Sequence, residues 1–186
     1  MKYLFVDIET TGLDERDGYI LEIALVAVTE DFEVLDCTNF IVDYNGHRGT
    51  TQRQVFYENT NEITMEMHSK NGLKEEFCNG DLQTRVKISE VAQYISQFIE
   101  MYWDGDRYNK PILAGSNPTF DKSWLEAHFP VLSNFWHYRV FDLNTLYMFF
   151  DHKKDTTRNH RALTDILADL DFVITLKNEY EELTTT

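Results

Sequence analysis

Residues 3–28 read YLFVDIETTGLDERDGYILEIALVAV and carry the clearest indication of the fold. They contain two segments, residues 3–11 and 19–28, that are apolar at both odd and even positions, a pattern typical of strands buried on two faces. The connection between them is short, and a third apolar segment follows at residues 34–42. The sequence therefore predicts that the chain opens with an antiparallel meander of three strands.

Beyond this stretch, helices are expected to alternate with short strands. Apolar residues recur at helical spacing over residues 88–103, which predicts an amphipathic helix there. The other elements that we predict are helices at 63–70 (ended by Gly72), 121–128, 143–150 (capped by Asp142) and about 161–178, with short strands at 111–116 and 140–141. This order predicts an α/β fold in which a mixed five-stranded sheet, an antiparallel three-strand meander plus parallel strands, is flanked by helices.

The chain has 186 residues, the size of a single domain. We assign residues 1–178 to that domain, with a polar loop at about 43–61, and residues 179–186 to a flexible acidic C-terminal tail. No apolar run approaches the roughly 20 residues that span a bilayer, and Asp7 interrupts the first run too early for a signal peptide. The two lone cysteines, Cys37 and Cys78, fit neither a disulfide framework nor a zinc cluster. We therefore expect a soluble, cytoplasmic protein.

The balance of charge is strongly acidic, with 17 Lys and Arg against 32 Asp and Glu and a net charge of −15. This acidic excess argues against a protein that binds long duplex DNA through the DNA phosphates. It does not exclude short or single-stranded substrates. Carboxylates are also the oxygen ligands that Mg²⁺ and Mn²⁺ prefer. Most of the acids are expected on the solvated surface, so only those on buried elements point to chemistry.

Asp7 and Glu9 lie on the first predicted strand. Residues two apart on a strand project to the same face, so the two carboxylates are expected side by side. On a buried strand such a pair is destabilising, through desolvation and repulsion, unless a cation neutralises it. The alternative is a strand end that reaches water.

Three more residues are candidates for chemistry. Asp121 follows a strand and a turn and opens a helix, where open sheets place ligands, although an Asp can equally help to start a helix. His160 and Asp165 would lie about 140° apart on a continuous helix, so they converge only if His160 precedes the helix. The polar segment 151–159 suits that placement. A solvated Asp165 and a structural His160 are the alternatives.

Together these residues form the series Asp-x-Glu, Asp and His-x₄-Asp, and with it the sequence resembles the DEDDh 3′→5′ exonucleases of the RNase H-like superfamily. Within that family it is most similar to the oligoribonucleases. The resemblance covers residues 1 to about 176 apart from the polar loop, and it implies an RNase H-like fold. The stretches that carry it are residues 6–14 (VDIETTGLD), 20–24 (ILEIA), 68–73 (HSKNGL), 137–139 (HYR) with Asp142 and residues 145–146 (TL), and 160–166 (HRALTDI).

The resemblance implies that Asp7, Glu9, Asp121 and Asp165 hold two divalent cations, Mg²⁺ or Mn²⁺, with His160 as general base. Four carboxylates can offset the charge of two such ions, which can stabilise both the attacking and the leaving oxygen. A free imidazole has a pKa of about 6.5 and can accept a proton from water at neutral pH. The implied reaction releases nucleoside 5′-monophosphates from the 3′ end of short single-stranded RNA.

Substrate contacts are implied as well. Leu13 resembles the residue that wedges against the terminal bases, and His68 resembles one that contacts the substrate. Arg139 matches an arginine that caps the 5′ phosphate, which a guanidinium can bind bidentately. Tyr138 matches a residue contributed by the partner subunit, which implies a homodimer. The alternative for Tyr138 and Arg139 is an ordinary pair at the edge of the sheet.

Two positions depart from the oligoribonuclease pattern. Two serines that help to form the phosphate cap in those enzymes are replaced here by Asn117 and Asn144. Asn117 restores an Asn-x₃-Asp form that is found in proofreading-type relatives. Amides can still donate hydrogen bonds to a phosphate, but the preference for dinucleotides is left open.

Three alternative functions remain open. The first is the same chemistry on DNA 3′ ends, which a contact to the ribose 2′-hydroxyl would separate from action on RNA. The second is an acidic binding module without catalysis, although a scaffold has no need of five converging polar residues. The third is an RNase H-like endonuclease or nucleotidyl transferase, which shares the acidic cluster, whereas the His-x₄-Asp pair is the mark of the exonucleases.

Overall fold

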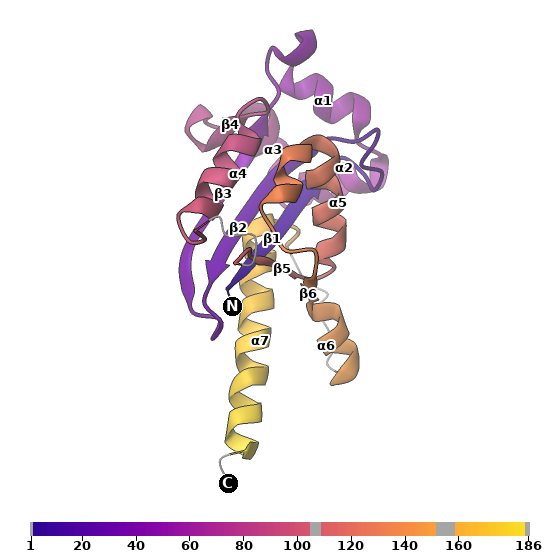
Figure 1. The fold of residues 1–186 in the computed structure, drawn as a ribbon. Coiled ribbons are helices and arrows are strands. Elements are labelled where there is room, and N and C mark those ends of the chain that lie inside the picture. Colours follow the sequence, from indigo (N-terminus) through magenta and orange to yellow (C-terminus); the bar gives the residue numbers. More distant parts are fainter. Residues whose placement is uncertain (1, 105–108, 152–158, 185–186) are drawn as a thin grey trace.

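The computed structural model describes residues 2–104, 109–151 and 159–184, and its strands form one six-stranded sheet (Figure 1). Strands β1 to β3 are the predicted antiparallel meander, and each of the other three strands lies parallel to its neighbour in the sheet. The order across the sheet is β4-β3-β2-β1-β5-β6. The bounds are β1 (Tyr3–Thr10), β2 (Ile20–Val28), β3 (Val34–Asp43), β4 (Arg85–Lys87), β5 (Ile112–Gly115) and β6 (Val140–Asp142).

Helices cover both faces of this sheet (Figure 1). One apolar cluster packs the sheet against α1, α3, α4 and α5, and a second packs the opposite face against α6 and α7. Every residue of β2 is buried, as its apolar character on both faces predicts. The helices are α1 (Gln52–Asn59), α2 (Glu62–Lys70), α3 (Leu73–Asn79), α4 (Val91–Glu100), α5 (Pro118–His128), α6 (Leu143–Phe149) and α7 (Ala162–Thr184), with short 3₁₀ segments at His47–Gly49, Leu82–Thr84 and Pro130–Asn134.

The alternation of side chains along β1 decides which face carries the acids. Leu4, Val6 and Ile8 belong to the cluster with α4 and α5, whereas Phe5 belongs to the cluster with α7. Asp7 and Glu9 have the parity of Phe5, so their carboxylates point toward the face that α7 covers. On the face of β1 that α7 covers, the side chains therefore change from apolar to acidic toward the C-terminal end of the strand.

The predicted polar loop at 43–61 is wrong in part, because α1 occupies residues 52–59. Only Val55 and Phe56 give this helix a buried apolar face, too few to produce a periodic pattern. Its sequence mark is the capping box, in which Thr51 accepts a hydrogen bond from the backbone of Gln54 and the Gln54 side chain bonds back to Thr51. The Thr51 and Gln54 pair is therefore the feature of the sequence that could have predicted the start of α1.

Other boundaries also differ from the prediction. The sheet has six strands rather than five, because the three residues of β4, too short to show an alternating pattern, pair with the edge of β3. The helix expected at 88–103 is α4, and Ile88 instead donates a backbone hydrogen bond to Asp43. Helix α3 follows Gly72 directly, and α7 continues to Thr184, so the expected tail is helical through that residue. Part of the polar segment 151–159 falls outside the described residues.

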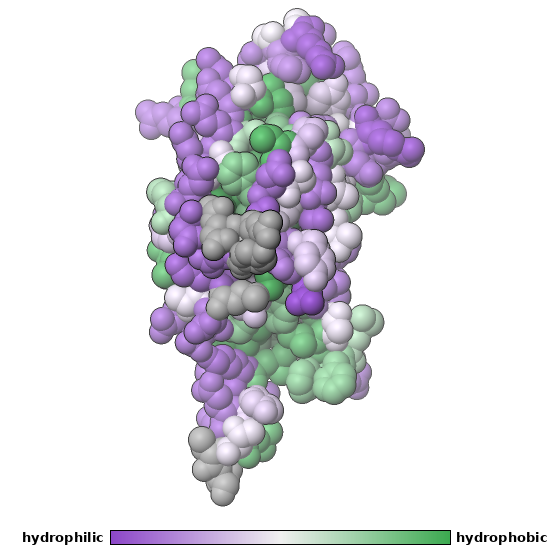
Figure 2. Space-filling model, in the orientation of Figure 1, coloured by the Kyte–Doolittle hydropathy of each residue, from purple (hydrophilic) through white to green (hydrophobic). Residues whose placement is uncertain are grey.

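The face of the molecule shown in Figure 2 is mainly hydrophilic, with an apolar region over α6 at its lower right. Met148, Phe149 and Phe150 are exposed there. Among the described helices, even the longest lacks the apolar character needed to cross a membrane.

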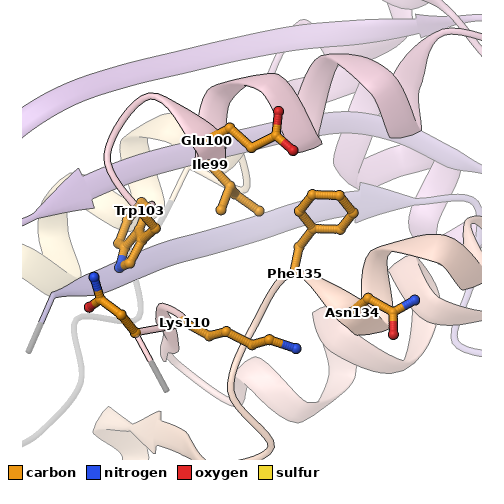
Figure 3. Close-up of a pocket in the computed structure, with 7 residues that line it drawn as sticks. Ile99, Glu100, Trp103, Lys110, Asn134 and Phe135 are labelled. Carbon is orange, nitrogen blue, oxygen red and sulfur yellow. The ribbon is translucent and has the colours of Figure 1, made fainter. Parts of the chain in front are cut away.

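A cavity of about 170 Å³ lies beside the start of β5 (Figure 3). Its walls include the aromatic side chains of Trp103 and Phe135 together with Ile99, and Glu100 and Lys110 lie at its margin. The predicted catalytic and substrate-binding residues are all absent from the described residues that line it. The cavity is therefore separate from the site that the sequence predicts.

The packing of Gly18 against α5 leads to a stability prediction. A Cβ atom at Gly18 would come within 2.3 Å of the Trp124 ring and 2.9 Å of the Asp14 carbonyl oxygen. Gly18→Ala should therefore lower the free energy of unfolding by about 1–3 kcal/mol, measured by urea denaturation. In the control Gly12→Ala, the new Cβ would meet only Asn61 Nδ2 at 3.9 Å, so a change within about 0.5 kcal/mol is expected. Equal loss of stability in both variants would contradict this packing argument.

Candidate active site

Four acids from three elements meet near the C-terminal end of β1. Asp7 and Glu9 come from β1, Asp121 from the first turn of α5, and Asp165 from the first turn of α7. Asp121 is tied directly to the strand, because its Oδ1 accepts a hydrogen bond of 2.9 Å from the backbone N–H of Ile8. Asp7 is half-buried and the other three acids are buried. The strand thus brings together carboxylates that are far apart in the sequence.

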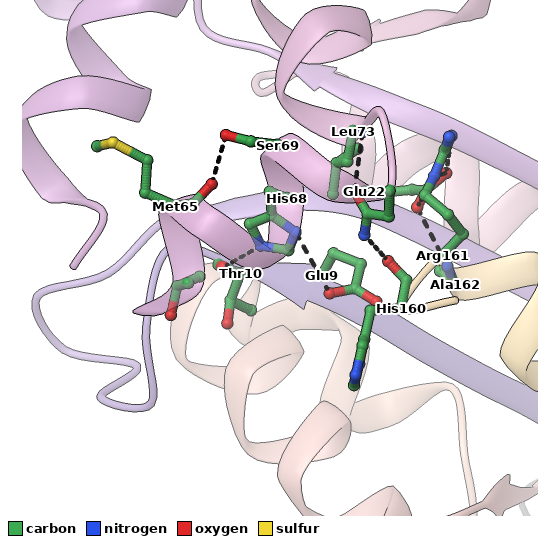
Figure 4. Close-up of polar contacts among 12 residues, drawn as sticks. Glu9, Thr10, Glu22, Met65, His68, Ser69, Leu73, His160, Arg161 and Ala162 are labelled. Atoms are coloured by element: carbon green, nitrogen blue, oxygen red, sulfur yellow. Dashed lines mark hydrogen bonds and ion pairs between the residues drawn. The ribbon is translucent and has the colours of Figure 1, made fainter. Parts of the chain in front are cut away.

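His160 lies just before α7 and completes this group. Its exposed side chain follows a backbone in the left-handed region, with φ of 48°. A ring nitrogen of His160 and carboxylate oxygens of Glu9 and Asp165 lie within 4.8 Å of one another. Figure 4 shows His160 beside Glu9. The convergence that the His-x₄-Asp spacing requires is therefore present, with His160 outside the helix and Asp165 inside it.

Burial and mutual repulsion perturb these acids. Desolvation, and then the charges of Glu22, Asp165 and Asp121, raise the pKa of Glu9 to about 9. Desolvation also raises the pKa of Asp121 to about 7, against the hydrogen bonds that favour its charged form. The pKa of Asp7 is raised by burial and by Asp121, Glu9 and Asp165. Without added positive charge the cluster therefore retains protons at neutral pH.

This donor set fits divalent metal ions. Carboxylate oxygens are the ligands that Mg²⁺ and Mn²⁺ prefer, and a cation at the cluster would offset the repulsion that raises these pKa values. Glu9 and Asp165 present oxygens close enough to share one ion. Asp7 and Asp121 lie close enough to each other for the charge of one to raise the pKa of the other. The residues present are therefore suited to hold the divalent cations that the sequence resemblance implies.

Two further buried acids, Glu22 and Asp169, were missed by the sequence reasoning. Asp169 accepts a hydrogen bond of 2.9 Å from the Ser116 hydroxyl, and its charge helps to raise the pKa of Asp121. It lies four residues after Asp165, a spacing that places both on one face of α7. Glu22 is opposite Glu9 in the register of β1 and β2. An acid inside the otherwise apolar β2 was the signal for Glu22.

His68 on α2 is completely buried beside Glu9. Its Nε2 lies 3.0 Å from the carbonyl oxygen of Thr10, so Nε2–H donates, while Nδ1 lies 4.0 Å from Glu9 Oε2 (Figure 4). Burial lowers the pKa of this imidazole. The side chain therefore supports the end of β1 from within, and the substrate contact predicted for it remains a prediction.

Asp142 joins the two asparagines that depart from the oligoribonuclease pattern. Its Oδ1 accepts hydrogen bonds of 3.0 Å from the backbone N–H groups of Asn117 and Asn144. Asn117 has φ of 66°, in the left-handed region where asparagine is well tolerated, and it directly precedes α5. Asp142 thus holds the starts of α5 and α6 together.

The remaining predicted contacts lie on the surface. Leu13, in the connection between β1 and β2, is 85% exposed, and Tyr138 is 73% exposed. The guanidinium carbon of Arg139 lies 5.3 Å from the centre of the Tyr138 ring, within the range of a cation–π contact. All three side chains are accessible to a ligand, which a substrate-binding role requires.

Comparisons with known proteins identify the family of this chain. A family model described as an exonuclease matches residues 4–173. The oligoribonuclease of Francisella tularensis subsp. tularensis is 26% identical over 177 residues, with 91% of this chain and 92% of that protein covered. A probable oligoribonuclease of Dictyostelium discoideum is 28% identical over 175 residues, with 89% and 83% covered.

Solved structures share the fold. Escherichia coli exonuclease I, in complex with a dT13 oligonucleotide, matches with a TM-score of 0.66 and 14% identity, covering 99% of this chain. An exonuclease I from Methylocaldum szegediense matches with a TM-score of 0.65 and 12% identity, covering 95% of this chain. This chain spans only 42% and 40% of those two proteins. At these identities the likeness concerns the fold alone.

The raised carboxyl pKa values predict how stability depends on pH in the presence of EDTA. Because the folded state keeps protons that the unfolded state has released, the free energy of unfolding should fall as pH rises from 4.5 to about 9, the two pKa values of Glu9. The slope is at most about 1.4 kcal/mol per pH unit for each such proton. Urea denaturation across this range should show the fall, and saturating Mg²⁺ should flatten it.

Two variants sharpen this test. Glu9→Gln removes one raised pKa and should reduce the slope, whereas Asp31→Asn, which changes a surface acid paired with Lys177, should leave it unchanged. A pH-independent stability of the chelated wild-type protein would contradict the electrostatic description of the cluster.

Proposed function

The chain belongs to the exonuclease family and is a 3′→5′ exonuclease, and from this premise we propose that it degrades short single-stranded oligoribonucleotides to nucleoside 5′-monophosphates. The observation that carries the proposal is the convergence of Asp7, Glu9, Asp121 and Asp165 with His160 near the end of β1. The oligoribonucleases that match nearly the whole chain support RNA as the substrate.

We assign the four acids to metal binding and His160 to proton transfer. Asp7, Glu9, Asp121 and Asp165 would hold two divalent cations, Mg²⁺ or Mn²⁺. When bound, these ions supply positive charge that stabilises the attacking and leaving oxygens of the phosphodiester. The protein contributes a fixed geometry, because the Asp121 carboxylate is bonded to the backbone of β1 and Asp165 lies on a helix packed against that strand.

In the proposed reaction, an imidazole nitrogen of His160 accepts the proton of the attacking water. The water oxygen forms a bond to the terminal phosphorus, and the bond from that phosphorus to the 3′ oxygen of the preceding nucleotide breaks. The 3′ oxygen gains a proton and becomes the new 3′ hydroxyl of the shortened strand. The released nucleotide keeps its 5′ phosphate. Because His160 is exposed, its ring can be reached by water and substrate.

Substrate binding is assigned to five residues that are not buried. Leu13 would pack against the terminal bases, and Arg139 would bind a phosphate oxygen pair, with Tyr138 beside it. Asn117 and Asn144 are proposed to donate to the substrate phosphate, with their backbones held by Asp142. DNA 3′ ends are the second candidate substrate, since the exonuclease I structure of the same fold contains a dT13 oligonucleotide.

A homodimer is part of the proposal. The exposed apolar side chains of Met148, Phe149 and Phe150 form a region over α6 that a second copy of this chain would cover (Figure 2). Large exposed apolar regions commonly mark protein interfaces. In this assembly Tyr138 would reach the site of the partner.

The function is tested by a time course with 5′-labelled RNA and DNA of two to about twenty nucleotides, in Mg²⁺, Mn²⁺ or EDTA. Removal of the RNA dinucleotide far faster than longer RNA or DNA is expected, with no turnover in EDTA. His160→Ala should lower kcat by about 10²–10⁴-fold because it removes the general base. Equal trimming of DNA and RNA would instead favour the general exonuclease.

Control variants separate loss of chemistry from loss of folding. Asp7→Asn should lower activity by about 10³-fold through loss of metal-based charge stabilisation, with near-wild-type circular dichroism. Asp31→Asn makes the same chemical change on the surface, beside Lys177, and should retain full activity. Full activity of Asp7→Asn would refute the proposed site.

The dimer is tested by light scattering coupled to size exclusion. The wild type should have the mass of two chains, and Phe149→Ser should have the mass of one, because Phe149 is 80% exposed at the proposed interface. Ile63→Ser, at an exposed apolar position on α2, should remain dimeric. A monomeric wild type would refute the assembly.

A further inference from the structure

His160 has an unusual position for a proposed general base. It lies outside regular structure, before the first residue of α7, and its backbone has the positive φ that side-chain-bearing residues rarely adopt. Its side chain is exposed, so packing does not hold the ring. The position of the imidazole relative to Glu9 and Asp165 must therefore come from contacts of the neighbouring backbone and residues.

The next residue, Arg161, is bound to acids from two different elements. Its Nη2 lies 2.8 Å from Glu22 Oε1 on β2, and its Nε also donates to Glu22 (Figure 4). The same Nη2 lies 2.6 Å from Glu76 Oε2 on α3. Two guanidinium nitrogens on one carboxylate fix orientation as well as distance. Arg161 therefore joins the start of α7 to the centre of the sheet and to α3.

Two more hydrogen bonds hold the backbone of this segment. The N–H of Ala162 donates to Glu22 Oε2 at 3.1 Å, so one carboxylate binds both the side chain of Arg161 and the helix start. The side-chain amide of Asn71, the residue that ends α2, donates to the carbonyl oxygen of His160. His160 is thus held at its own carbonyl and through the two residues that follow it.

The burial of Glu22 is informative. Its side chain is 1% exposed within a strand whose other residues are apolar, and it stands opposite Glu9 in the register. A buried ion pair is often no more stabilising than an apolar replacement of similar volume, so stability alone is a weak reason for it. What the pair does provide is a fixed geometry between β2 and the segment that carries His160.

We infer that Glu22, Arg161 and Glu76, with Asn71, form a clamp that positions the His160 imidazole against Glu9 and Asp165, and that Glu22 and Arg161 are positioning residues of the reaction. This inference rests on the proposed function, in which His160 is the general base. The clamp acts through His160 and the backbone, so its loss should change kcat rather than KM. Misplacement of a reacting group by about 1 Å can lower a rate about 10²-fold.

The first test is a double-mutant cycle on oligoribonucleotide hydrolysis. Arg161→Gln should lower kcat by about 10²-fold, with KM within about twofold of the wild type. In a His160→Ala background the same substitution should cause no further loss, because the clamp then has no base to position. A residue that acted through metal binding or general folding would lower the residual rate in that background too.

Two variants control for folding and for charge. Glu22→Gln retains the size of the side chain and should also lower kcat selectively, in protein with a wild-type circular dichroism spectrum. Lys177→Gln removes another paired cation, which lies on α7 and is bound to Asp31, and should leave kcat unchanged. The inference is overturned if Arg161→Gln and Glu22→Gln both retain kcat, or if their losses are equal in the two backgrounds.

A second readout is independent of activity. The ring resonances of His160, identified by their absence in His160→Ala, should shift or broaden in Arg161→Gln and remain in place in Lys177→Gln. Unmoved resonances in Arg161→Gln would overturn the clamp even if the enzyme is active. If the wild-type protein hydrolyses none of the oligonucleotides, the proposed function fails, and the catalytic role of the clamp fails with it. Shifted His160 resonances in Arg161→Gln would still establish that the clamp positions the ring.

Discussion

The site is dominated by the concentration of acidic side chains around the C-terminal end of β1. The pKa values of Asp7 and Glu9 on β1 are raised because both side chains are poorly solvated and lie near Asp121 on α5 and Asp165 on α7. Such a cluster persists only where a rigid scaffold holds its members against repulsion. Here the scaffold is the packing of β1 between apolar clusters on the two faces of the sheet. The same repulsion is what makes the cluster a good place for divalent cations.

A second layer of residues surrounds the acids and comes mainly from segments after the meander. His68 on α2 lies between Thr10 and Glu9, and Glu76 on α3 helps to bind Arg161. Asp142 holds the starts of α5 and α6 through the backbones of Asn117 and Asn144. The helices between β3 and β4 therefore do more than connect strands, because they fix the environment of Glu9 and His160.

The distribution of charge also bears on the substrate. A net charge of −15 opposes the accumulation of long phosphate chains at the surface, since binding of nucleic acid gains most from many cationic contacts. A short oligonucleotide needs fewer such contacts. Under the proposed function, divalent ions would neutralise its reacting 3′ end and Arg139 would bind a phosphate. The acidity of the chain is thus compatible with a nuclease whose substrates are short, and it gives less support to one that tracks along a long strand.

The meander and the order of the site residues could be predicted from the sequence alone. Runs that are apolar on both faces identify β1 and β2, and the parity of Phe5, Asp7 and Glu9 follows from the pleat of a strand. The His-x₄-Asp spacing required His160 to precede α7, where the structure has it. These features depend on neighbours in the chain, so local physics is enough to predict them.

The elements and contacts that depend on distant partners arise from tertiary packing. Helices α1 and α3 and strand β4 are short and have few apolar positions, so their stability comes from packing on the sheet rather than from their own pattern. Glu22 and Arg161 are 139 positions apart, and the approach of Asp121 to Ile8 spans 113. Contacts between residues so far apart in the sequence depend on how the whole chain packs. No local sequence pattern encodes that packing.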